Sequence, residues 1–171
     1  MLQEIIKFEE LNSQNWNEFE ELIMKSQLSF PEILRDSSET YFNILSLSDS
    51  IGIIMLLNDV YIGNAIGFTE SSDKIFLYNL SIEKEYQHNG YGYLLLEEFI
   101  HKARDLNYKV IVGNFRDTSL SLVRKFEGVE KEVLRNYYDS GEDFNYCEIN
   151  INKKVNKNEW TRFQENVWKE N

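Results

Sequence analysis

The feature that most restricts how this chain can fold is a short turn near its middle, Gln87-His88-Asn89-Gly90-Tyr91-Gly92. An apolar segment with strand character enters the turn, and an amphipathic segment with helical periodicity starts directly after it. The first turn of a helix has unpaired backbone N–H groups and the positive end of the helix dipole, and glycine lets the backbone approach an anion closely. The turn therefore suits a phosphate or pyrophosphate group, although a Gly-x-Gly pattern alone more often marks a plain tight turn.

The segments before the turn predict one strand, two helices and a three-stranded meander. Residues 5–8 have strand character, and Asn15 can cap a helix that starts at Trp16. Pro31 suits the first turn of a second helix that extends to Leu45. Polar turns then separate three expected strands, at residues 51–57, 60–68 and 75–82.

The segments after the turn predict a long helix, a strand, a further helix and a closing hairpin. The buried face of the long helix is expected to consist of Leu95, Leu96, Phe99, Ala103 and Leu106. A short buried strand follows at residues 110–112, and Asp117 or Thr118 can cap a helix that ends at Gly128. The closing hairpin is expected at residues 129–138 and 144–151. This order predicts an α/β (α+β) fold, with a mixed, mostly antiparallel sheet of about seven strands and helices on both faces.

Composition and periodicity divide the chain into one globular domain, residues 1–151, and a C-terminal segment, residues 152–171. Apolar residues make up 42% of the 171 residues and aromatic residues 14%, enough for a substantial core. In the C-terminal segment one stripe of apolar residues recurs at helical spacing, formed by Trp160, Phe163, Val167 and Trp168. We expect an extra helix there that packs on its own domain or, alternatively, on the partner subunit of a homodimer.

Charge and the absence of targeting patterns restrict the partners. The net charge is −11, which argues against general affinity for nucleic acid or anionic membranes. Residues 1–50 hold ten acidic and three basic side chains, which would attract cations, although a solvated acidic surface is the plainer interpretation. No apolar run approaches the ~18–20 residues of a membrane span, and Met1-Leu2-Gln3-Glu4 does not resemble a signal peptide. We expect a cytoplasmic protein, and its single cysteine excludes a disulfide framework.

The run from Asn79 to Leu96 closely resembles the principal signature of the GNAT acetyltransferase superfamily. That signature is Gln or Arg, two residues, Gly, any residue and then Gly or Ala, which Gln87, Gly90 and Gly92 match. In the superfamily it is entered from a strand that ends in an apolar residue, here Ile82. The predicted order of elements is also that of the superfamily, so the resemblance covers most of the chain. It implies a GNAT fold and direct transfer of the acetyl group of acetyl-CoA to a primary amine.

The resemblance also implies which residues bind acetyl-CoA. The CoA pyrophosphate would be held by backbone amides of Gln87, His88, Asn89, Gly90, Tyr91, Gly92 and Tyr93. Main-chain groups of Leu80 and Ile82 would pair with the pantetheine arm, and the Leu80 N–H would stabilise the tetrahedral oxyanion. This strand would splay from the next one, which Asn114 and Ser119 follow. These two residues are candidates for contacts with the CoA arm, or alternatively simple caps.

The chain departs from the superfamily pattern at the groups that move protons. Many members have a tyrosine, which protonates the leaving thiolate, in the helix before the glycine that corresponds to Gly128. This chain has Leu122-Val123-Arg124-Lys125 there. Some members have a glutamate base early in the strand before the turn, where this chain has Ile75-Phe76-Leu77-Tyr78.

Tyr138 and Tyr137 are the leading remaining candidates for catalysis, ahead of Tyr78 and Asn79. The two leading candidates lie in the run Arg135-Asn136-Tyr137-Tyr138-Asp139, which resembles a segment of N-terminal acetyltransferases of ribosomal proteins in which tyrosines line the acceptor site. Tyr138 would act as the acid and Tyr137 would contact the acceptor. Packing of two aromatic rings in a hairpin is the equal alternative.

The leading hypothesis is therefore an N-acetyltransferase for a primary amine. The acidic first half favours a small cationic amine, such as a polyamine or aminoglycoside, and the tyrosine hairpin favours a protein N-terminus. The alternative is a catalytically weak or inactive GNAT-fold protein that binds acetyl-CoA as a sensor or assembly partner. Cys147 alternates with Ile149 and Ile151 as a core residue, and His88 and His101 lack ligand spacing, so no metal site is predicted.

Overall fold

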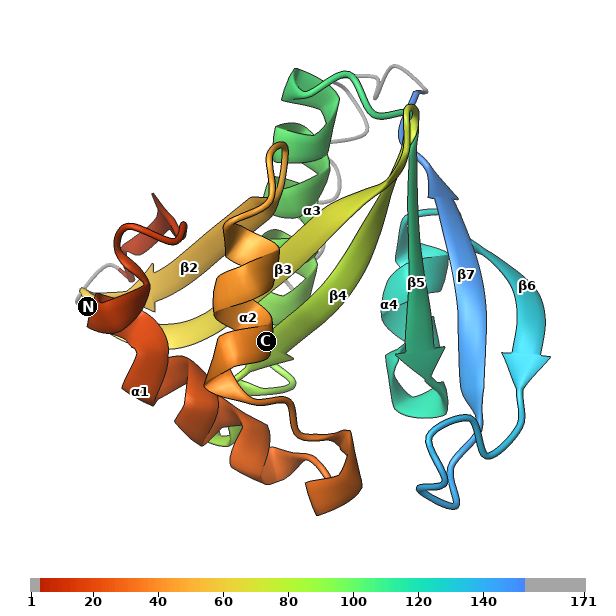
Figure 1. Ribbon diagram of the computed structural model, residues 1–171, viewed down its shortest axis with the longest axis horizontal. Coiled ribbons are helices and arrows are strands. Elements are labelled where there is room, and N and C mark those ends of the chain that lie inside the picture. The colour runs from red at the N-terminus through yellow and green to blue at the C-terminus, as the bar shows by residue number, and fades with distance from the viewer. Residues whose placement is uncertain (1–3, 153–171) are drawn as a thin grey trace.

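The computed structural model describes residues 4–152, which form one seven-stranded sheet with helices on both faces (Figure 1). The strands are β1 (Ile6–Glu10), β2 (Ile51–Leu57), β3 (Val60–Ser71), β4 (Lys74–Ile82), β5 (Val110–Arg116), β6 (Val129–Leu134) and β7 (Phe144–Asn150). The helices are α1 (Trp16–Ser26), α2 (Ser38–Leu45), α3 (Tyr91–Asp105) and α4 (Leu120–Lys125). The predicted order of elements and the predicted fold class are confirmed.

The sheet is antiparallel except at one junction in its middle. Its strand order is β1-β2-β3-β4-β5-β7-β6, and only β4 and β5 are parallel neighbours. These two strands pair only where residues 74–76 face residues 110–112. Beyond that point they separate, as Figure 1 shows, while β4 remains paired with β3 and β5 with β7. The predicted splay between the two strands is therefore present.

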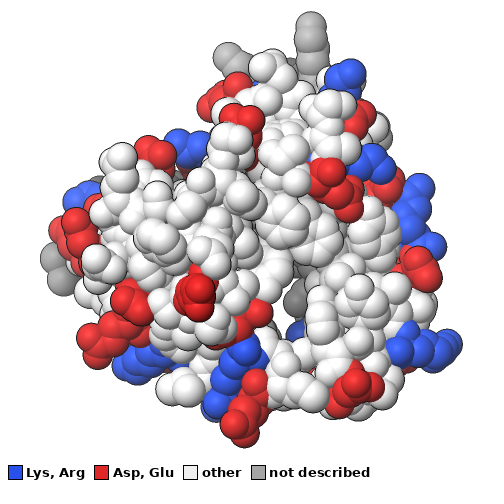
Figure 2. All heavy atoms as spheres, in the orientation of Figure 1, with Lys and Arg blue, Asp and Glu red and all other residues white. Residues whose placement is uncertain are grey.

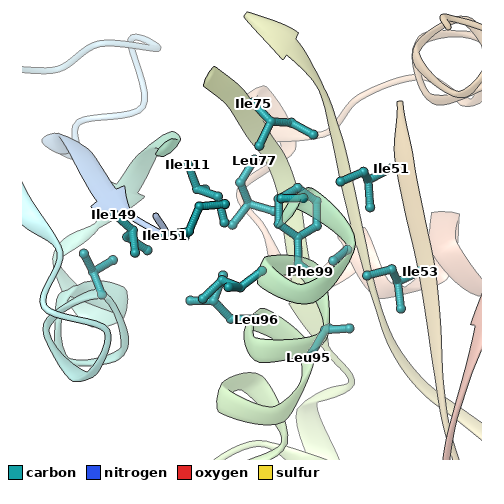
Figure 3. Close-up of a cluster of buried hydrophobic side chains, with 14 of the residues drawn as sticks. Ile51, Ile53, Ile75, Leu77, Leu95, Leu96, Phe99, Ile111, Ile149 and Ile151 are labelled. Atoms are coloured by element: carbon teal, nitrogen blue, oxygen red, sulfur yellow. The ribbon is translucent and has the colours of Figure 1, made fainter. Parts of the chain in front are cut away.

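The two faces of the sheet bury two separate hydrophobic cores. On one face α1 and α2 pack on β3, with Trp16, Ile23 and Tyr41 buried between helices and sheet. On the other face α3 packs across β2, β3 and β4, and α4 packs on β7. Figure 3 shows this second core, where Leu96 and Phe99 of α3 point toward Leu77 and the isoleucines of the strands.

The buried face of α3 differs from its prediction at one residue. Leu95, Leu96, Phe99 and Ala103 are fully buried, as expected, but Leu106 is 42% exposed. Leu106 lies just beyond the last residue of α3, where the chain leaves the helix, so it no longer follows the buried stripe. Ile100, six residues earlier, is buried instead.

The second helix starts later than predicted. Pro31 precedes a single 3-10 turn, Glu32–Leu34, and the chain is extended again at Arg35. The helix proper begins at Ser38, because the Ser37 side chain accepts a hydrogen bond from the Thr40 N–H and so caps it. The prediction of one continuous helix from Pro31 is therefore wrong.

Two predicted caps also differ in detail. Asn15 does precede α1, but its side chain bonds to Asn12 N–H and the Glu10 carbonyl rather than to the helix. After α4 the left-handed residue is Glu127, with φ of 55°, and not Gly128. Gly128 is needed for close packing instead, since a Cβ there would come within 2.3 Å of Val123 Cγ1.

The predicted C-terminal helix, with its stripe from Trp160 to Trp168, lies outside the described residues. Within residues 4–152 no helix combines the length and apolar character needed to cross a bilayer.

Candidate acetyl-transfer site

The turn between β4 and α3 is held by its own side chains. Gln87 Nε2 donates to the Ile82 carbonyl at 2.9 Å, which ties the turn to the end of β4. Asn89 Nδ2 donates to the Gln87 carbonyl at 3.0 Å. Gly90 precedes α3 with φ of 84°, in the left-handed region that glycine adopts without steric cost, and His88 is also left-handed. The turn is therefore a defined structure.

This turn leaves a run of backbone amides free. The Gln87 N–H donates to the Lys84 carbonyl at 3.3 Å, and the Tyr93 N–H donates to the Gly90 carbonyl at 3.1 Å. Between them, the N–H groups from His88 to Gly92 have no acceptor in the part of the chain that the structure describes. They lie at the positive end of the α3 dipole, so they can bind an anionic group together.

The rings of the tyrosines in this region are occupied by packing. The Tyr91 ring is 7% exposed and belongs to the core under α3. The Tyr93 ring stacks on Phe126 with centroids 4.5 Å apart. Burial raises the pKa of Tyr93 to about 12, so its phenol stays protonated at neutral pH. These residues therefore offer their main chains rather than their side chains to a ligand at the turn.

Main-chain groups of β4 point toward the side from which β5 has separated. The Glu83 N–H donates to the Ile62 carbonyl at 2.8 Å, and the register pairs Ile82 with Gly63. Hydrogen-bonded and non-bonded pairs alternate along an antiparallel ladder, so Leu80 and Ile82 direct their N–H groups away from β3. Because β5 is no longer paired at this level, the Leu80 N–H is free to bind a ligand.

A cavity of about 230 Å³ lies between the separated strands, and we call it the slot. Four of the predicted site residues line it, namely Leu80, Asn114, Ser119 and Tyr138. Leu122, which also lines the slot, lies beside the turn, because a Cβ built on Gly92 would be 3.9 Å from Leu122 Cδ2. In Figure 2 the groove between the two halves of the molecule is bordered mainly by uncharged atoms, with most charged side chains around the rim. The turn and the slot are thus neighbouring parts of one site.

The two tyrosines of the β6–β7 hairpin occupy different positions. Tyr138 lines the slot, and its hydroxyl accepts a hydrogen bond from Asn114 Nδ2 at 3.3 Å. Its ring packs edge-on against Phe144, with centroids 4.9 Å apart. Tyr137 is 54% exposed, packs against Tyr138 and does not line the slot. Of the two hairpin tyrosines only Tyr138 therefore lines the slot, and α4 supplies no tyrosine.

One carboxylate in the slot was not predicted from the sequence. Asp36, from the loop between α1 and α2, lines the slot, and the Tyr78 hydroxyl donates to its Oδ1 at 2.8 Å. The Tyr41 hydroxyl lies 3.5 Å from Oδ2. Asp36 was hidden by the prediction of one helix from Pro31, which would have placed it on a helix surface. The signal that reveals it is the Ser37 cap, since the residue before a helix cap lies in the loop.

The phenols around Asp36 belong to a chain of buried polar groups. Asn79 Nδ2 donates to the Tyr41 hydroxyl at 3.2 Å, and Asn64 Nδ2 donates to Asn79 Oδ1 at 2.8 Å. Tyr61 donates to Asn64 Oδ1 at 2.7 Å. Burial is the main cause that raises the pKa values of Tyr41, Tyr61 and Tyr78, and the Asp36 charge also raises those of Tyr41 and Tyr78. These phenols therefore remain protonated donors at neutral pH.

Other reactive side chains are placed away from this chemistry. Cys147 is fully buried, as predicted, and burial raises the pKa of its thiol to about 11, so it is no nucleophile at neutral pH. His101 is exposed on α3 and His88 is exposed in the turn. Among the described residues no group of His, Cys, Asp and Glu side chains is arranged to hold a metal ion.

Comparisons with known proteins agree with this fold. No curated protein sequence matches the chain significantly. Among solved structures, the ribosomal-protein-S18-alanine N-acetyltransferase from Escherichia coli superposes with a TM-score of 0.74 at 20% identity, covering 88% of this chain and 97% of that one. An aminoglycoside 6'-N-acetyltransferase complexed with coenzyme A gives a TM-score of 0.73 at 13% identity, covering 88% of this chain and 99% of that one. The protein yncA from Salmonella typhimurium, a putative acetyltransferase solved with its cofactor acetyl-CoA, gives a TM-score of 0.68 at 13% identity. The superposition covers 88% of this chain and 96% of that one.

A match to a family model adds sequence evidence to these similarities of fold. The model described as the acetyltransferase (GNAT) family matches residues 10–126, which include β4, the glycine turn, α3 and the separated part of β5. The match covers more than half of the chain, and the chain belongs to the GNAT acetyltransferase family.

Proposed function

We propose that this protein is an N-acetyltransferase that transfers the acetyl group of acetyl-CoA directly to a primary amine in the slot. One observation carries the proposal. The free amides from His88 to Gly92 lie beside a cavity toward which the Leu80 N–H points. Similar proteins solved with coenzyme A or acetyl-CoA support acetyl-CoA as the donor.

In this proposal the main chain binds the donor. The amides of residues 88–92 hold the CoA pyrophosphate at the N-terminus of α3. Leu80 and Ile82 extend the β4 ladder to the pantetheine arm, whose amide groups replace the missing strand partner. The Leu80 N–H donates to the thioester carbonyl, where it stabilises the negative charge that develops on the oxygen. Asn114 and Ser119 lie on the opposite wall of the slot.

The chemical step needs no covalent enzyme intermediate. The amine must first lose its extra proton, to a base or to water in the slot, because only the neutral nitrogen has a free electron pair. That pair forms the C–N bond, and the carbonyl electrons move onto the oxygen. When the carbonyl re-forms, the C–S bond breaks and the sulfur keeps the electron pair. Tyr138 gives its proton to the thiolate, and the second proton lost by the amide nitrogen passes through water to the Tyr138 phenolate, which restores the phenol.

Tyr138 takes the acid role here because it is the hairpin tyrosine that lines the slot. The hydrogen bond from Asn114 orients that hydroxyl so that its own proton is available to a group in the slot. The packing of its ring on Phe144 fixes its position. Coenzyme A thiolate is a fair leaving group, so a single phenol is a sufficient acid.

Two assays on the purified protein test the proposal. Release of free thiol from acetyl-CoA in the presence of a panel of primary amines measures turnover, and the thermal unfolding midpoint with and without acetyl-CoA measures binding. We expect acetyl-CoA to raise the midpoint and at least one amine to give steady thiol release. A raised midpoint with no turnover for any amine would instead support the acetyl-CoA sensor. No change in the midpoint at millimolar acetyl-CoA would overturn both.

A further inference from the structure

The slot contains a carboxylate that is held in a fixed position. Gln27 is only 2% exposed and binds both main-chain groups of Asp36. Its Oε1 accepts the Asp36 N–H at 2.8 Å, and its Nε2 donates to the Asp36 carbonyl at 3.1 Å. The Tyr78 hydroxyl donates to Asp36 Oδ1 at 2.8 Å, whereas the Tyr41 hydroxyl lies nearer to Gln27 Oε1, at 3.2 Å, than to Asp36 Oδ2, at 3.5 Å. A carboxylate can accept about four hydrogen bonds, so Asp36 retains capacity for a donor in the slot.

Asp36 also differs from the other charged residue of the slot in its ion pairing. Among the residues that line the slot only Asp36 and Arg116 are charged. Arg116 is already paired, because its Nε and Nη2 each lie 2.8 Å from a carboxylate oxygen of Glu142. Asp36, in contrast, forms no ion pair with any cation in residues 4–152. A carboxylate without a counterion in a partly desolvated cavity attracts a cation.

The rest of the slot suits apolar groups. The loop that carries Asp36 contributes Phe30, Ile33 and Leu34, and Ile33 is 58% exposed. The sheet contributes Phe76 of β4 and Phe144 of β7, among other apolar side chains. A ligand with several ammonium groups would have one of them at Asp36 and the others against apolar walls or near Arg116, where they would be unpaired.

We propose that the acceptor is a primary amine with a single positive charge next to an apolar substituent, and that Asp36 binds its ammonium group. This inference rests on the proposed acetyl transfer and names the substrate class of the same slot. The required chemistry is present in small monoamines and in peptide N-termini that begin with an apolar residue. Polyamines and aminoglycosides lack this chemistry, because each of them carries several positive charges.

The test compares acceptors and then removes the charge. Thiol release is measured with 2-phenylethylamine, with a neutral tetrapeptide amide that begins with an apolar residue, and with spermidine. We expect kcat/KM for 2-phenylethylamine and for the peptide to exceed that for spermidine by about tenfold or more. Whichever of these two acceptors has the higher kcat/KM shows whether the natural acceptor is a small monoamine or a peptide N-terminus. Preference for spermidine while acetyl-CoA still binds and turns over would overturn this inference and leave the proposed function intact.

Asp36→Asn keeps the size of the side chain and removes its charge. We expect KM for the monoamine to rise about tenfold or more, with KM for acetyl-CoA changed less than twofold. Glu39→Gln is the matched control, since Glu39 is an exposed acid of the same half of the chain, at the start of α2 and outside the slot. Asp36→Glu, which retains the charge, should recover part of the lost affinity. Equal effects of Asp36→Asn and Glu39→Gln would show that the acidic surface as a whole, and not Asp36, attracts the amine.

Discussion

The proposed acetyl-transfer site has two sides, which we call the donor side and the acceptor side, and they are built from different parts of the chain. The donor side consists of main-chain groups within one continuous segment, from Leu80 to Gly92. The acceptor side consists of side chains from three separate segments, namely Asp36 of the α1–α2 loop, Tyr78 of β4 and Tyr138 of the β6–β7 hairpin. The first depends on backbone shape, whereas the second depends on the identity of each side chain.

This difference explains how one fold can keep its donor while its acceptor varies. Backbone amides at a helix terminus persist through most side-chain substitutions, provided that the turn retains its shape. A substitution in the α1–α2 loop or in the hairpin changes the acceptor side without touching the turn. Two proteins of similar fold are named after acceptors as unlike as a ribosomal-protein alanine and an aminoglycoside.

The largest effect is expected from alkaline pH, which acts on the buried phenols that support the acceptor side. Burial raises the pKa values of Tyr41, Tyr61 and Tyr78 above the ordinary value of about 10. Below about pH 10 these phenols are protonated in both the folded and the unfolded chain. Above it they ionise only on unfolding, so the free energy of unfolding should fall by about 1.4 kcal/mol per pH unit for each phenol.

Urea unfolding at pH 9, 10 and 11 measures this loss of stability. Tyr61→Phe should reduce the dependence on pH, because the Tyr61 hydroxyl no longer titrates. Tyr137→Phe, at an exposed ring, should leave the dependence unchanged. A free energy that stays constant between pH 9 and 11 would contradict the buried polar network as described.

The next effect tests whether the acceptor side also supplies the acid. Tyr138→Phe keeps the ring against Phe144 and removes only the hydroxyl. We expect kcat to fall about a hundredfold, the lower end of the range for general acid catalysis. KM for acetyl-CoA should not change, because the donor side is main chain. Tyr137→Phe is the control, and a similar loss of kcat in both variants would show that the hairpin acts by shape and not through the Tyr138 hydroxyl.

A smaller effect is expected when the backbone of the donor side is strained. Gly90 and Gly141 both have left-handed φ values, 84° and 77°, but Gly90 precedes α3 and Gly141 lies in the β6–β7 hairpin. Alanine at either position costs about 1–2 kcal/mol of local strain. Gly90→Ala should therefore raise KM for acetyl-CoA by about five- to thirtyfold, as the turn relaxes and its amides lose alignment. Gly141→Ala should leave that KM unchanged, and an equal rise in both would place the effect in global stability.

The same division decides how much could be predicted from the sequence. The turn was predictable because its physics is local, with glycine, a helix start and an apolar strand next to one another in the chain. Leu80, Asn114 and Ser119 were expected because the chain resembles the GNAT superfamily around the turn, and all three line the slot. The acceptor side was only half predicted, since Tyr138 lies in a recognisable run whereas Asp36 lies in a loop of no fixed period. The proposed role of Asp36 depends on a hydrogen bond from Tyr78, which lies 42 residues away in the sequence. Such a contact exists only once the sheet has formed.

The smallest effect is expected from the ion pair that neutralises Arg116 at the edge of the acceptor side. Glu142→Gln leaves a guanidinium without its carboxylate in the wall of the slot. The pair is partly exposed, so stability should change by less than about 1 kcal/mol. The freed positive charge should nevertheless repel an ammonium group, which raises KM for a cationic amine about two- to threefold at low ionic strength and less in salt. KM for acetyl-CoA should not rise.

Glu130→Gln provides the matched control for this last variant. Glu130 also pairs with an arginine, Arg124, but that pair lies on α4 and β6 and does not line the slot. If the amine responds to Glu142→Gln and not to Glu130→Gln, the effect comes from the charge in the slot. Because Arg116 and Asp36 lie in the same slot, the pairing of Arg116 with Glu142 is a condition for Asp36 to attract the amine. A KM that is equal in both variants would remove Arg116 from the acceptor side and leave Asp36 as its sole charge.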